Sequence, residues 1–162
     1  MASLSLSNLN VYPFQSKSPL SNYYPTQLVF DGLAFSSSEA AYQSHKTNNP
    51  NLWVKFVGLN PDDAKKLGRS VQLRPDWEEI KFTLMYNVVN AKFAQCAEFR
   101  KELMSTGNKL IVEETTPWHD PIWGVCNCQK CKTEHITSQN LLGIALTMLR
   151  ENKRIVYLNG SC

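Results

Sequence analysis

Apolar residues recur at helical spacing along two long segments of the chain, and this pattern predicts a mainly helical protein. In residues 76–94 the apolar positions cover so wide a face that we expect a central helix packed on several sides. Residues 138–151 carry two neighbouring apolar rows and predict a second strong helix. Shorter helices are expected at residues 98–105, 62–67 and 52–57.

Short β elements are expected between these helices. The apolar triplets at residues 28–30 and 33–35 flank Asp31-Gly32, a two-residue turn signal, so they predict a β-hairpin. Residues 109–115 are expected to form a short strand, and residues 154–158 a small edge strand or a loose tail. The predicted fold class is therefore mainly α (α+β): a multihelical single domain with a small β-hairpin.

The helix predicted directly after the hairpin carries unusual polar residues. Ser36 and Glu39 have capping-box spacing, which predicts a helix over residues 36–47. Four of its residues are spaced i, i+3, i+4 and i+7 and share one face, while the opposite face offers no large apolar group. We interpret the first face as pointing into a cleft; a solvated face with a capping glutamate is the alternative. The four residues are Glu39, Tyr42, Gln43 and Lys46.

The composition agrees with one globular domain. The chain has 162 residues, of which 43% are hydrophobic and 19% are charged, and it contains no internal repeat. We expect the domain to span residues 14–152, with an N-terminal extension at residues 1–13 and a C-terminal tail at residues 153–162. A net charge of +3 suits an anionic ligand such as a phosphate, but it is far from that of a dedicated nucleic-acid coat protein.

The chain carries no sequence signal for a membrane or for secretion. No stretch approaches the roughly 20 apolar residues that span a bilayer. The first residues lack the basic and apolar segments of a secretory signal. The cysteines are odd in number, and three of them crowd into one loop, which does not favour a framework of disulfides. We therefore expect a cytoplasmic protein.

Several motifs together resemble one protein family. Residues 35–46, FSSSEAAYQSHK, resemble the signature of the YbiA-like, or NADAR, family, in which Glu, an aromatic residue followed by Gln, and Lys occupy matching positions. Further motifs follow in order over roughly residues 14–150, and their combination is specific although each piece is weak. They lie at residues 18–23, 64–69, 74–85, 92–93, 103–107, 123–124 and 140–143.

The resemblance implies a mainly helical single domain that hydrolyses an N-glycosyl bond. Members of the family are associated with two substrates that share a ribose C1–N bond and a nearby phosphate. One is the phosphoribosyl-aminopyrimidine intermediates of riboflavin synthesis, and the other is ADP-ribose attached to guanine in DNA. The mild positive charge slightly favours ADP-ribosylated guanine, with single-stranded DNA as the partner. The alternatives are the riboflavin intermediates and a non-catalytic ADP-ribose-binding module.

The resemblance also implies roles for catalytic side chains. Cleavage of the C1–N bond builds positive charge on the sugar, so a carboxylate beside C1 stabilises the transition state or activates water. Glu39 is the first candidate for this carboxylate and Asp120 the second. Lys46 is expected to be either a Schiff-base nucleophile, which requires a lowered amine pKa, or a phosphate contact.

Other residues are expected to bind the substrate. Trp77 and Trp123 are candidates for stacking on the base, although Trp77 also fits the apolar stripe of the central helix. Arg69, or Arg74 in its place, is a candidate for binding phosphate. Asn140 is expected in the first turn of a helix, where free N–H groups also favour an anion. A cap or turn contact is the alternative role for each polar residue. The predicted set is Ser21, Asn22, Tyr42, Gln43, Arg69, Trp77, Trp123, Gly124 and Asn140.

The chain departs from the family pattern between Trp123 and Asn140, where a cysteine-rich loop replaces a short glycine-rich link. Its C-x-C-x2-C-x3-H spacing supplies four ligands for tetrahedral zinc, although the C-x-C pair is cramped. A loop of reduced thiols is the alternative, and no other cofactor is expected. A zinc-stabilised nucleic-acid-binding module would also need a basic surface, which two loop lysines do not provide. The four ligands would be Cys126, Cys128, Cys131 and His135.

Overall fold

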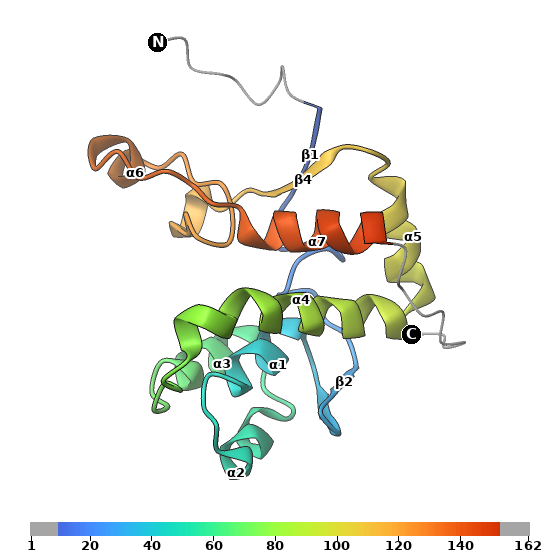
Figure 1. The fold of residues 1–162 in the computed structure, drawn as a ribbon, viewed down its shortest axis with the longest axis vertical. Helices are drawn as coiled ribbons and strands as arrows, with labels where there is room; N and C mark the ends of the chain where they lie inside the picture. The colour runs from blue at the N-terminus through green and yellow to red at the C-terminus, as the bar shows by residue number, and fades with distance from the viewer. Residues whose placement is uncertain (1–9, 153–162) are drawn as a thin grey trace.

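The computed structural model describes residues 10–152, and helices predominate in this part of the chain (Figure 1). They are arranged around α4 (Trp77–Gln95), which packs against α7 (Leu141–Asn152) on one side and α1 (Ser38–Ser44) on another. Figure 1 shows α7 above α4, with α1 and α3 (Pro61–Gly68) below it. This arrangement confirms the predicted mainly helical α+β fold.

The wide apolar face of α4 explains its central place. Its buried residues form two adjacent rows, and partly buried aromatic and aliphatic residues widen this face on both flanks. Besides α1 and α7, the helix contacts β2 (Leu28–Phe30) and α5 (Ala97–Ser105). The buried residues of α4 are Trp77, Leu84, Met85, Val88, Val89, Lys92 and Phe93.

One member of these rows is a buried cation. Lys92 is 1% exposed, and its ammonium group donates a hydrogen bond of 2.7 Å to the backbone oxygen of Ser21. Burial lowers the pKa of Lys92 to about 7. The contact fixes the segment of Ser21 and Asn22 against α4, next to the start of α1, where Glu39 N donates to the backbone oxygen of Asn22.

β1 (Val11–Phe14) and β4 (Leu110–Glu113) form a parallel pair over their whole length. α7 covers β4 so closely that a Cβ atom at Gly143 would lie 2.1 Å from the backbone oxygen of Ile111. The strand expected at residues 109–115 is present in a shorter form. Because β1 begins at Val11, the sheet starts within the segment expected as an N-terminal extension.

The predicted hairpin is confirmed. β2 pairs with β3 (Leu33–Phe35) in antiparallel register. The turn residues Asp31 and Gly32 have φ angles of 47° and 78°, as a two-residue turn of the primed type requires. A hydrogen bond of 2.9 Å joins the Asp31 carboxylate to Nε2 of His45, so the hairpin turn is attached to the end of α1.

The boundaries of α1 differ from the prediction. The capping residue is Ser37 rather than Ser36, because Ser37 is extended and its hydroxyl accepts a hydrogen bond from Ala40 N at 3.1 Å. The helix ends at Ser44, earlier than the expected residue 47; His45 caps it through its backbone N–H, and Nδ1 of its buried ring contacts the Ala41 oxygen at 3.0 Å. Every residue of α1 is buried, which is unusual for a helix so rich in polar side chains.

The shorter helices also differ at their ends. The helix expected at residues 52–57 consists of α2 (Pro50–Trp53) and the 3₁₀ helix η2 (Val54–Phe56). α2 begins earlier than expected because the Asn49 side chain caps it by accepting a hydrogen bond from Asn51 N. α3 begins one residue earlier than expected, where Asn60 caps it. Two short helices were not predicted, η3 (Thr116–Trp118) and α6 (Gln129–Thr133), and neither was the strand β1.

α7 begins at Leu141 instead of residue 138. Asn140 has a φ of 54°, a left-handed conformation that a helix cannot include, so Asn140 lies before the helix and not in its first turn. Its amide is held by β4, because it donates to the Ile111 oxygen at 2.9 Å and accepts from Glu113 N at 3.2 Å. The left-handed turn therefore aligns α7 with the strand it covers.

The strand or tail expected at residues 154–158 lies outside the described residues. Within residues 10–152 we find no helix with the length and apolar character needed to cross a bilayer.

The close contact between α7 and β4 predicts that a methyl group added at Gly143 lowers the stability of the fold. Gly143→Ala would place its Cβ against the Ile111 backbone oxygen and the Asn140 amide that is bonded to β4, neither of which can move aside easily, so we expect a loss of about 2 kcal/mol or more. This corresponds to a fall in Tm of roughly 5 °C, measured by thermal unfolding. Met148→Ala on the exposed side of α7 is the control and should change Tm little; equal Tm values for both variants would contradict the packing argument.

Candidate active site

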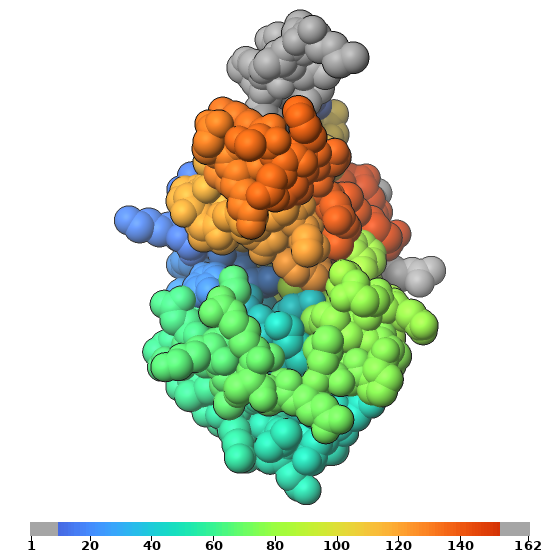
Figure 2. All heavy atoms as spheres, turned by 90° about the vertical axis from the view of Figure 1, so that its left-hand side faces the viewer, coloured from blue at the N-terminus to red at the C-terminus, as the bar shows by residue number. Residues whose placement is uncertain are grey.

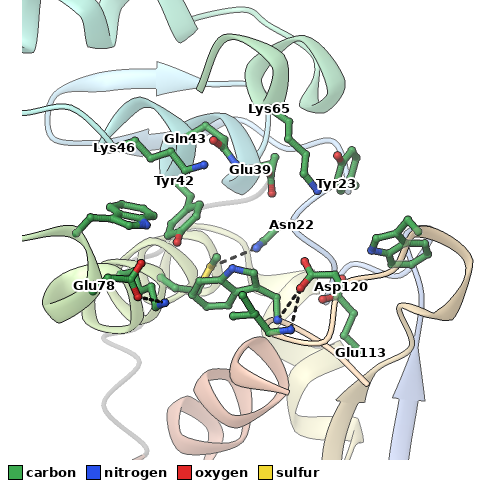
Figure 3. Close-up of a pocket in the computed structure, with 16 residues that line it drawn as sticks. Asn22, Tyr23, Glu39, Tyr42, Gln43, Lys46, Lys65, Glu78, Glu113 and Asp120 are labelled. Carbon is green, nitrogen blue, oxygen red and sulfur yellow. Dashed lines mark hydrogen bonds and ion pairs between the residues drawn. The ribbon is translucent and has the colours of Figure 1, made fainter. Parts of the chain in front are cut away.

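A pocket of about 280 Å³ opens between helices α1 and α3 and the segment that connects β4 to α7. In Figure 2 it lies in the hollow between the green atoms of the α3–α4 region and the orange atoms of the connecting segment, with cyan atoms of α1 at its base. Figure 3 shows that charged and aromatic side chains from both sides point into this space.

One wall of the pocket is the polar face of α1. Glu39, Tyr42, Gln43 and Lys46 all line it, so the side chains at i, i+3, i+4 and i+7 do meet one cavity. Asn22 lines the pocket beside them and is held by Ser38, whose hydroxyl donates to the Asn22 side-chain oxygen at 2.9 Å. The interpretation of α1 as a cleft-facing helix therefore describes its orientation correctly.

Glu39 is a buried carboxyl group at this wall. It is 7% exposed, and Gln43 Nε2 donates a hydrogen bond of 2.8 Å to it. Burial raises the pKa of Glu39, while the Gln43 hydrogen bond and the positive charges of Lys65 and Lys46 act in the opposite direction. A carboxyl group with few partners in a polar pocket is able to interact with a charge that develops on a ligand.

Gln43 is positioned by close packing against α3. A Cβ atom at Gly68 would lie 2.0 Å from Gln43 Oε1, so only glycine leaves room for this amide. Gln43 Oε1 is buried and, among the described residues, has no hydrogen-bond donor. The side chain therefore supports Glu39 through its nitrogen and offers an unsatisfied acceptor through its oxygen.

Lys46 is a half-buried amine close to an indole ring. Its Nζ lies 5.7 Å from the centre of the Trp77 ring, and within residues 10–152 it forms no hydrogen bond or ion pair. Burial lowers the pKa of Lys46, with a further contribution from Lys65 and Arg69, whereas Glu39 raises it. A lowered amine pKa is the property that a Schiff-base nucleophile requires.

The opposite wall carries Asp120. One of its carboxylate oxygens accepts hydrogen bonds from the backbone N–H groups of Ile122 at 3.0 Å and Trp123 at 2.9 Å. These bonds form a tight turn that directs both Asp120 and Trp123 toward the pocket, which they line. Asp120 faces Glu39 across the cavity in Figure 3.

Glu113 is a lining residue that the sequence interpretation missed. It ends the apolar strand β4, is 7% exposed and lines the pocket next to Asp120. Burial, followed by the negative charges of Asp120 and Glu39, raises the pKa of Glu113 to about 8, although Lys65 lowers it. The sequence offers only a lone acidic residue at the end of an apolar run as a signal. The direction of its side chain is seen only in the fold.

Aromatic rings surround the carboxyl groups. The centre of the Tyr42 ring lies 5.3 Å from that of Trp77 and 5.3 Å from that of Trp123, and all three residues line the pocket. Trp77 is also 8% exposed and belongs to the core, so its predicted pocket role and its core role are compatible. Such rings provide flat apolar surfaces for a sugar or a base.

A second cavity of about 730 Å³ adjoins the pocket. The two share Tyr23, Lys65, Glu113 and Trp118 as lining residues. The second cavity is also lined by Ser21, by the acidic Asp62 and by a cluster of basic side chains on α3 and at its end, whose larger number favours an anionic ligand. The basic residues are Lys65, Lys66 and Arg69.

Three residues considered for substrate binding do not line either of these cavities. Arg74 forms an ion pair with Asp76, 2.6 Å between Nε and Oδ1, at a separate surface depression. Asn140 is buried and its amide is bonded to β4. Gly124 lies beneath the pocket wall, where a Cβ atom would lie 2.6 Å from the Glu113 backbone oxygen. Asn140 and Gly124 thus contact the backbone of β4 and hold the pocket wall in position, without lining the pocket themselves.

The cysteine-rich loop gathers its three cysteines, but with a different histidine from the one expected. His119, and not His135, lies with Cys126, Cys128 and Cys131, while His135 is exposed. None of these five residues lines the pocket.

Comparison with known proteins identifies similar chains. The sequence pattern of the NADAR domain matches residues 5–154. N-glycosidase Npun_R5314 of Nostoc punctiforme is 30% identical over 140 residues, which cover 83% of this chain and 84% of that protein. Riboflavin biosynthesis protein VVA0006 of Vibrio vulnificus is 31% identical over 117 residues, which cover 69% of this chain and 31% of that protein. The NMR structure of Escherichia coli YbiA matches with a TM-score of 0.75 and 27% identity, over 95% of this chain and 91% of that chain.

The raised pKa of Glu113 predicts how stability depends on pH. Between pH 4.5 and 8 the unfolded chain loses the Glu113 proton while the folded protein keeps it, so the free energy of unfolding should fall as pH rises, by about 5 kcal/mol in total from this group. Glu113→Gln should remove this part of the decline, as measured by urea unfolding at pH 5 and pH 8.5.

The adjacent Glu114→Gln is the control, because Glu114 is only partly buried and its carboxylate accepts a hydrogen bond from Gln15. If wild-type protein and Glu113→Gln lose stability in parallel over this pH range, Glu113 does not hold a proton in the folded protein.

Proposed function

This chain belongs to the NADAR domain family, and we propose that it is an N-glycosidase that removes ADP-ribose from guanine in DNA by hydrolysing the ribose C1–N bond. The observation that carries the proposal is the buried Glu39 carboxyl group in a pocket lined by aromatic rings, with the amine of Lys46 on the same wall. The N-glycosidase name of the Nostoc relative supports the reaction class.

The pocket contains the groups that such a reaction needs. As the C1–N bond breaks, positive charge develops on the ribose, and the Glu39 carboxylate is placed to stabilise it, with Asp120 on the opposite wall as the second carboxylate. Water adds its oxygen to C1, and its proton leaves through a carboxylate acting as base. The products are a free sugar hydroxyl at C1 and a base with its N–H restored.

The leaving nitrogen also needs a proton, and Glu113 is suited to donate it. A carboxyl group with a pKa of about 8 is mostly protonated at neutral pH, so it acts as a general acid. Its neighbour Asp120 lines the same pocket and is the candidate proton acceptor. Two acidic groups in different surroundings thus divide the acid and base roles.

Lys46 offers a second route to the same products. Its neutral amine could attack C1 of the opened ribose and expel the base, and water would then hydrolyse the Schiff base and return the amine. The lowered pKa of Lys46 increases the fraction of neutral amine and supports this route. If Lys46 instead stays charged, it serves as a phosphate contact, and Glu39 carries the reaction without a covalent intermediate.

The adjoining cavity supports ADP-ribose as the sugar donor. A ribose in the smaller pocket would extend its 5′-phosphates toward Lys65, Lys66 and Arg69, and the second cavity of about 730 Å³ has room for a diphosphate and a further nucleoside. A substrate with a single 5′-phosphate would use only part of this space. The guanine would leave through the open side of the pocket.

A second candidate substrate is supported by the Vibrio relative, whose name refers to riboflavin biosynthesis. A phosphoribosyl-aminopyrimidine carries the same C1–N bond and would place its phosphate at the same basic residues. A non-catalytic ADP-ribose-binding module is the third candidate, and it would not require the combination of Glu39, Lys46 and Glu113 in one pocket.

Release of ADP-ribose from DNA tests the proposal directly. We expect wild-type protein to liberate free ADP-ribose from a single-stranded oligonucleotide modified on guanine, detected by mass spectrometry. Glu39→Gln and Lys46→Ala should each lower the rate by about 10²–10⁴-fold, because each removes a group placed at the reacting bond. Glu98→Gln and Lys101→Ala alter exposed residues of α5 and should keep the wild-type rate.

Each outcome separates the candidates. No release from DNA, together with hydrolysis of a phosphoribosyl-aminopyrimidine, would move the assignment to the second substrate. Binding of ADP-ribose without hydrolysis of either substrate would identify the binding module.

The rate should also depend on pH through Glu113. We expect kcat to fall as pH rises above about 8, because the deprotonated Glu113 cannot donate to the leaving nitrogen. Glu113→Gln should lower kcat at pH 7 and remove this alkaline decline, which is measured by rates between pH 6 and 9.5. An unchanged alkaline limb in Glu113→Gln would assign the proton donor to another group.

A further inference from the structure

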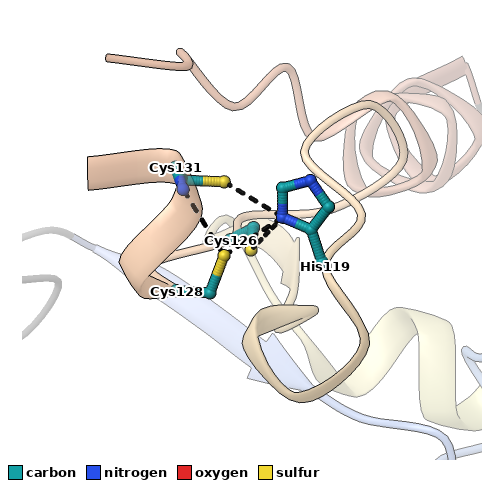
Figure 4. Close-up of side chains that lie close together, drawn as sticks. All are labelled: His119, Cys126, Cys128 and Cys131. Carbon is teal, nitrogen blue, oxygen red and sulfur yellow. Dashed lines mark hydrogen bonds between the residues drawn. The ribbon is translucent and has the colours of Figure 1, made fainter. Parts of the chain in front are cut away.

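Three thiols and one imidazole converge outside the pocket, in the cysteine-rich loop. Nδ1 of His119 lies 3.0 Å from Sγ of Cys128, 3.5 Å from that of Cys131 and 3.8 Å from that of Cys126. All four ligand atoms lie within 4.8 Å of one another. Figure 4 shows the three sulfur atoms gathered around the same imidazole nitrogen.

These separations match a tetrahedral metal site. Bonds of about 2.3 Å to sulfur and about 2.0 Å to nitrogen, at tetrahedral angles, place the nitrogen about 3.5 Å from each sulfur. The observed values lie on both sides of this distance, so a central ion would require only small movements of the side chains. Hydrogen bonds alone do not explain the cluster, because one imidazole nitrogen cannot serve three thiols at once.

The chemistry of the ligands selects the metal. Three thiolates and an imidazole are soft and intermediate ligands, which favour zinc in a four-coordinate tetrahedral site over magnesium or calcium. Four protein ligands leave no open position for water or substrate, as in structural zinc sites. Each thiol gives up its proton to the solvent when it binds the ion.

The surrounding backbone holds the ligands in place. Cys128 caps α6, and its sulfur accepts a hydrogen bond from the backbone N–H of Cys131 at 3.5 Å. The N–H of Cys126 is bonded to the Ser138 hydroxyl at 2.9 Å. His119 has a φ of 54°, a left-handed conformation that few non-glycine residues adopt without a structural requirement. This turn directs the His119 ring toward the cysteines (Figure 4).

We propose that His119, Cys126, Cys128 and Cys131 bind one zinc ion, which anchors the pocket-forming segment between β4 and α7. His119 lies between Trp118 and Asp120, and both of these neighbours line the pocket. In the described part of the chain this segment contains little regular structure, namely one isolated β-bridge, η3 and the short helix α6. A metal cross-link of His119 to the cysteines therefore supplies rigidity that packing does not.

The choice between His119 and His135 gives a sharp test. Purified, reduced protein incubated with zinc sulfate and passed over a desalting column should contain about one zinc ion per chain by mass spectrometry of the metal. His135→Ala should retain the same zinc content, because His135 is exposed and outside the cluster. His119→Ala and Cys128→Ser should lose most of the zinc, to less than about a tenth of the wild-type content.

A measurement on wild-type protein covers the case in which these variants fail to fold. Cobalt(II) in place of zinc should give the strong visible bands of tetrahedral coordination and the near-ultraviolet absorption of thiolate ligands. Cobalt bands of a six-coordinate site, a wild-type protein without zinc after incubation, or loss of zinc only in His135→Ala would overturn the proposal. None of these readouts depends on glycosidase activity, so the metal site and the proposed function are tested separately.

Discussion

Burying the Glu39 carboxyl group costs free energy, and much of the structure around α1 compensates for that cost. Gln43 donates to it, and Gly68 leaves the space that Gln43 needs. Lys46 and Lys65 supply positive charge nearby, although burial still raises the pKa of Glu39. α3 therefore packs closely against α1, and at this contact the Gln43 amide lies between the Gly68 backbone and the Glu39 carboxyl group.

The two walls of the pocket come from distant parts of the chain and meet through a common framework. α1 packs on α4, α4 packs on α7, and α7 covers β4, whose last residue is Glu113. The carboxyl groups of Glu39 and Glu113 are thus held by a continuous series of core contacts. The negative charges of Asp120 and Glu39 contribute to the raised pKa of Glu113, and that of Asp120 contributes to the raised pKa of Glu39, so packing energy maintains an electrostatic arrangement that would not form by itself.

Local patterns in the sequence were sufficient for most of the helices and for the hairpin, because these depend on periodicity and on turn residues such as Asp31-Gly32. The polar face of α1 was also predictable from spacing. The role of Glu113 was not, since an acidic residue at the end of a strand gives no local sign of which side chains surround it. The left-handed conformations of His119 and Asn140 were equally hidden, because long-range contacts impose them. Sequence spacing alone therefore predicts His135 as the fourth ligand, whereas the fold brings His119 to the cysteines.

The parallel pairing of β1 with β4 has a consequence for how the protein is made. The two strands lie about a hundred residues apart in sequence, and closing so long a loop is entropically costly and slow. During synthesis β1 leaves the ribosome first and has no partner until most of the chain has followed. Its hydrogen-bonding edge stays unpaired throughout that interval, which is the period when the nascent chain is most exposed to wrong strand pairing. Because β4 also carries Glu113, this wall of the pocket forms only after most of the chain has been synthesised.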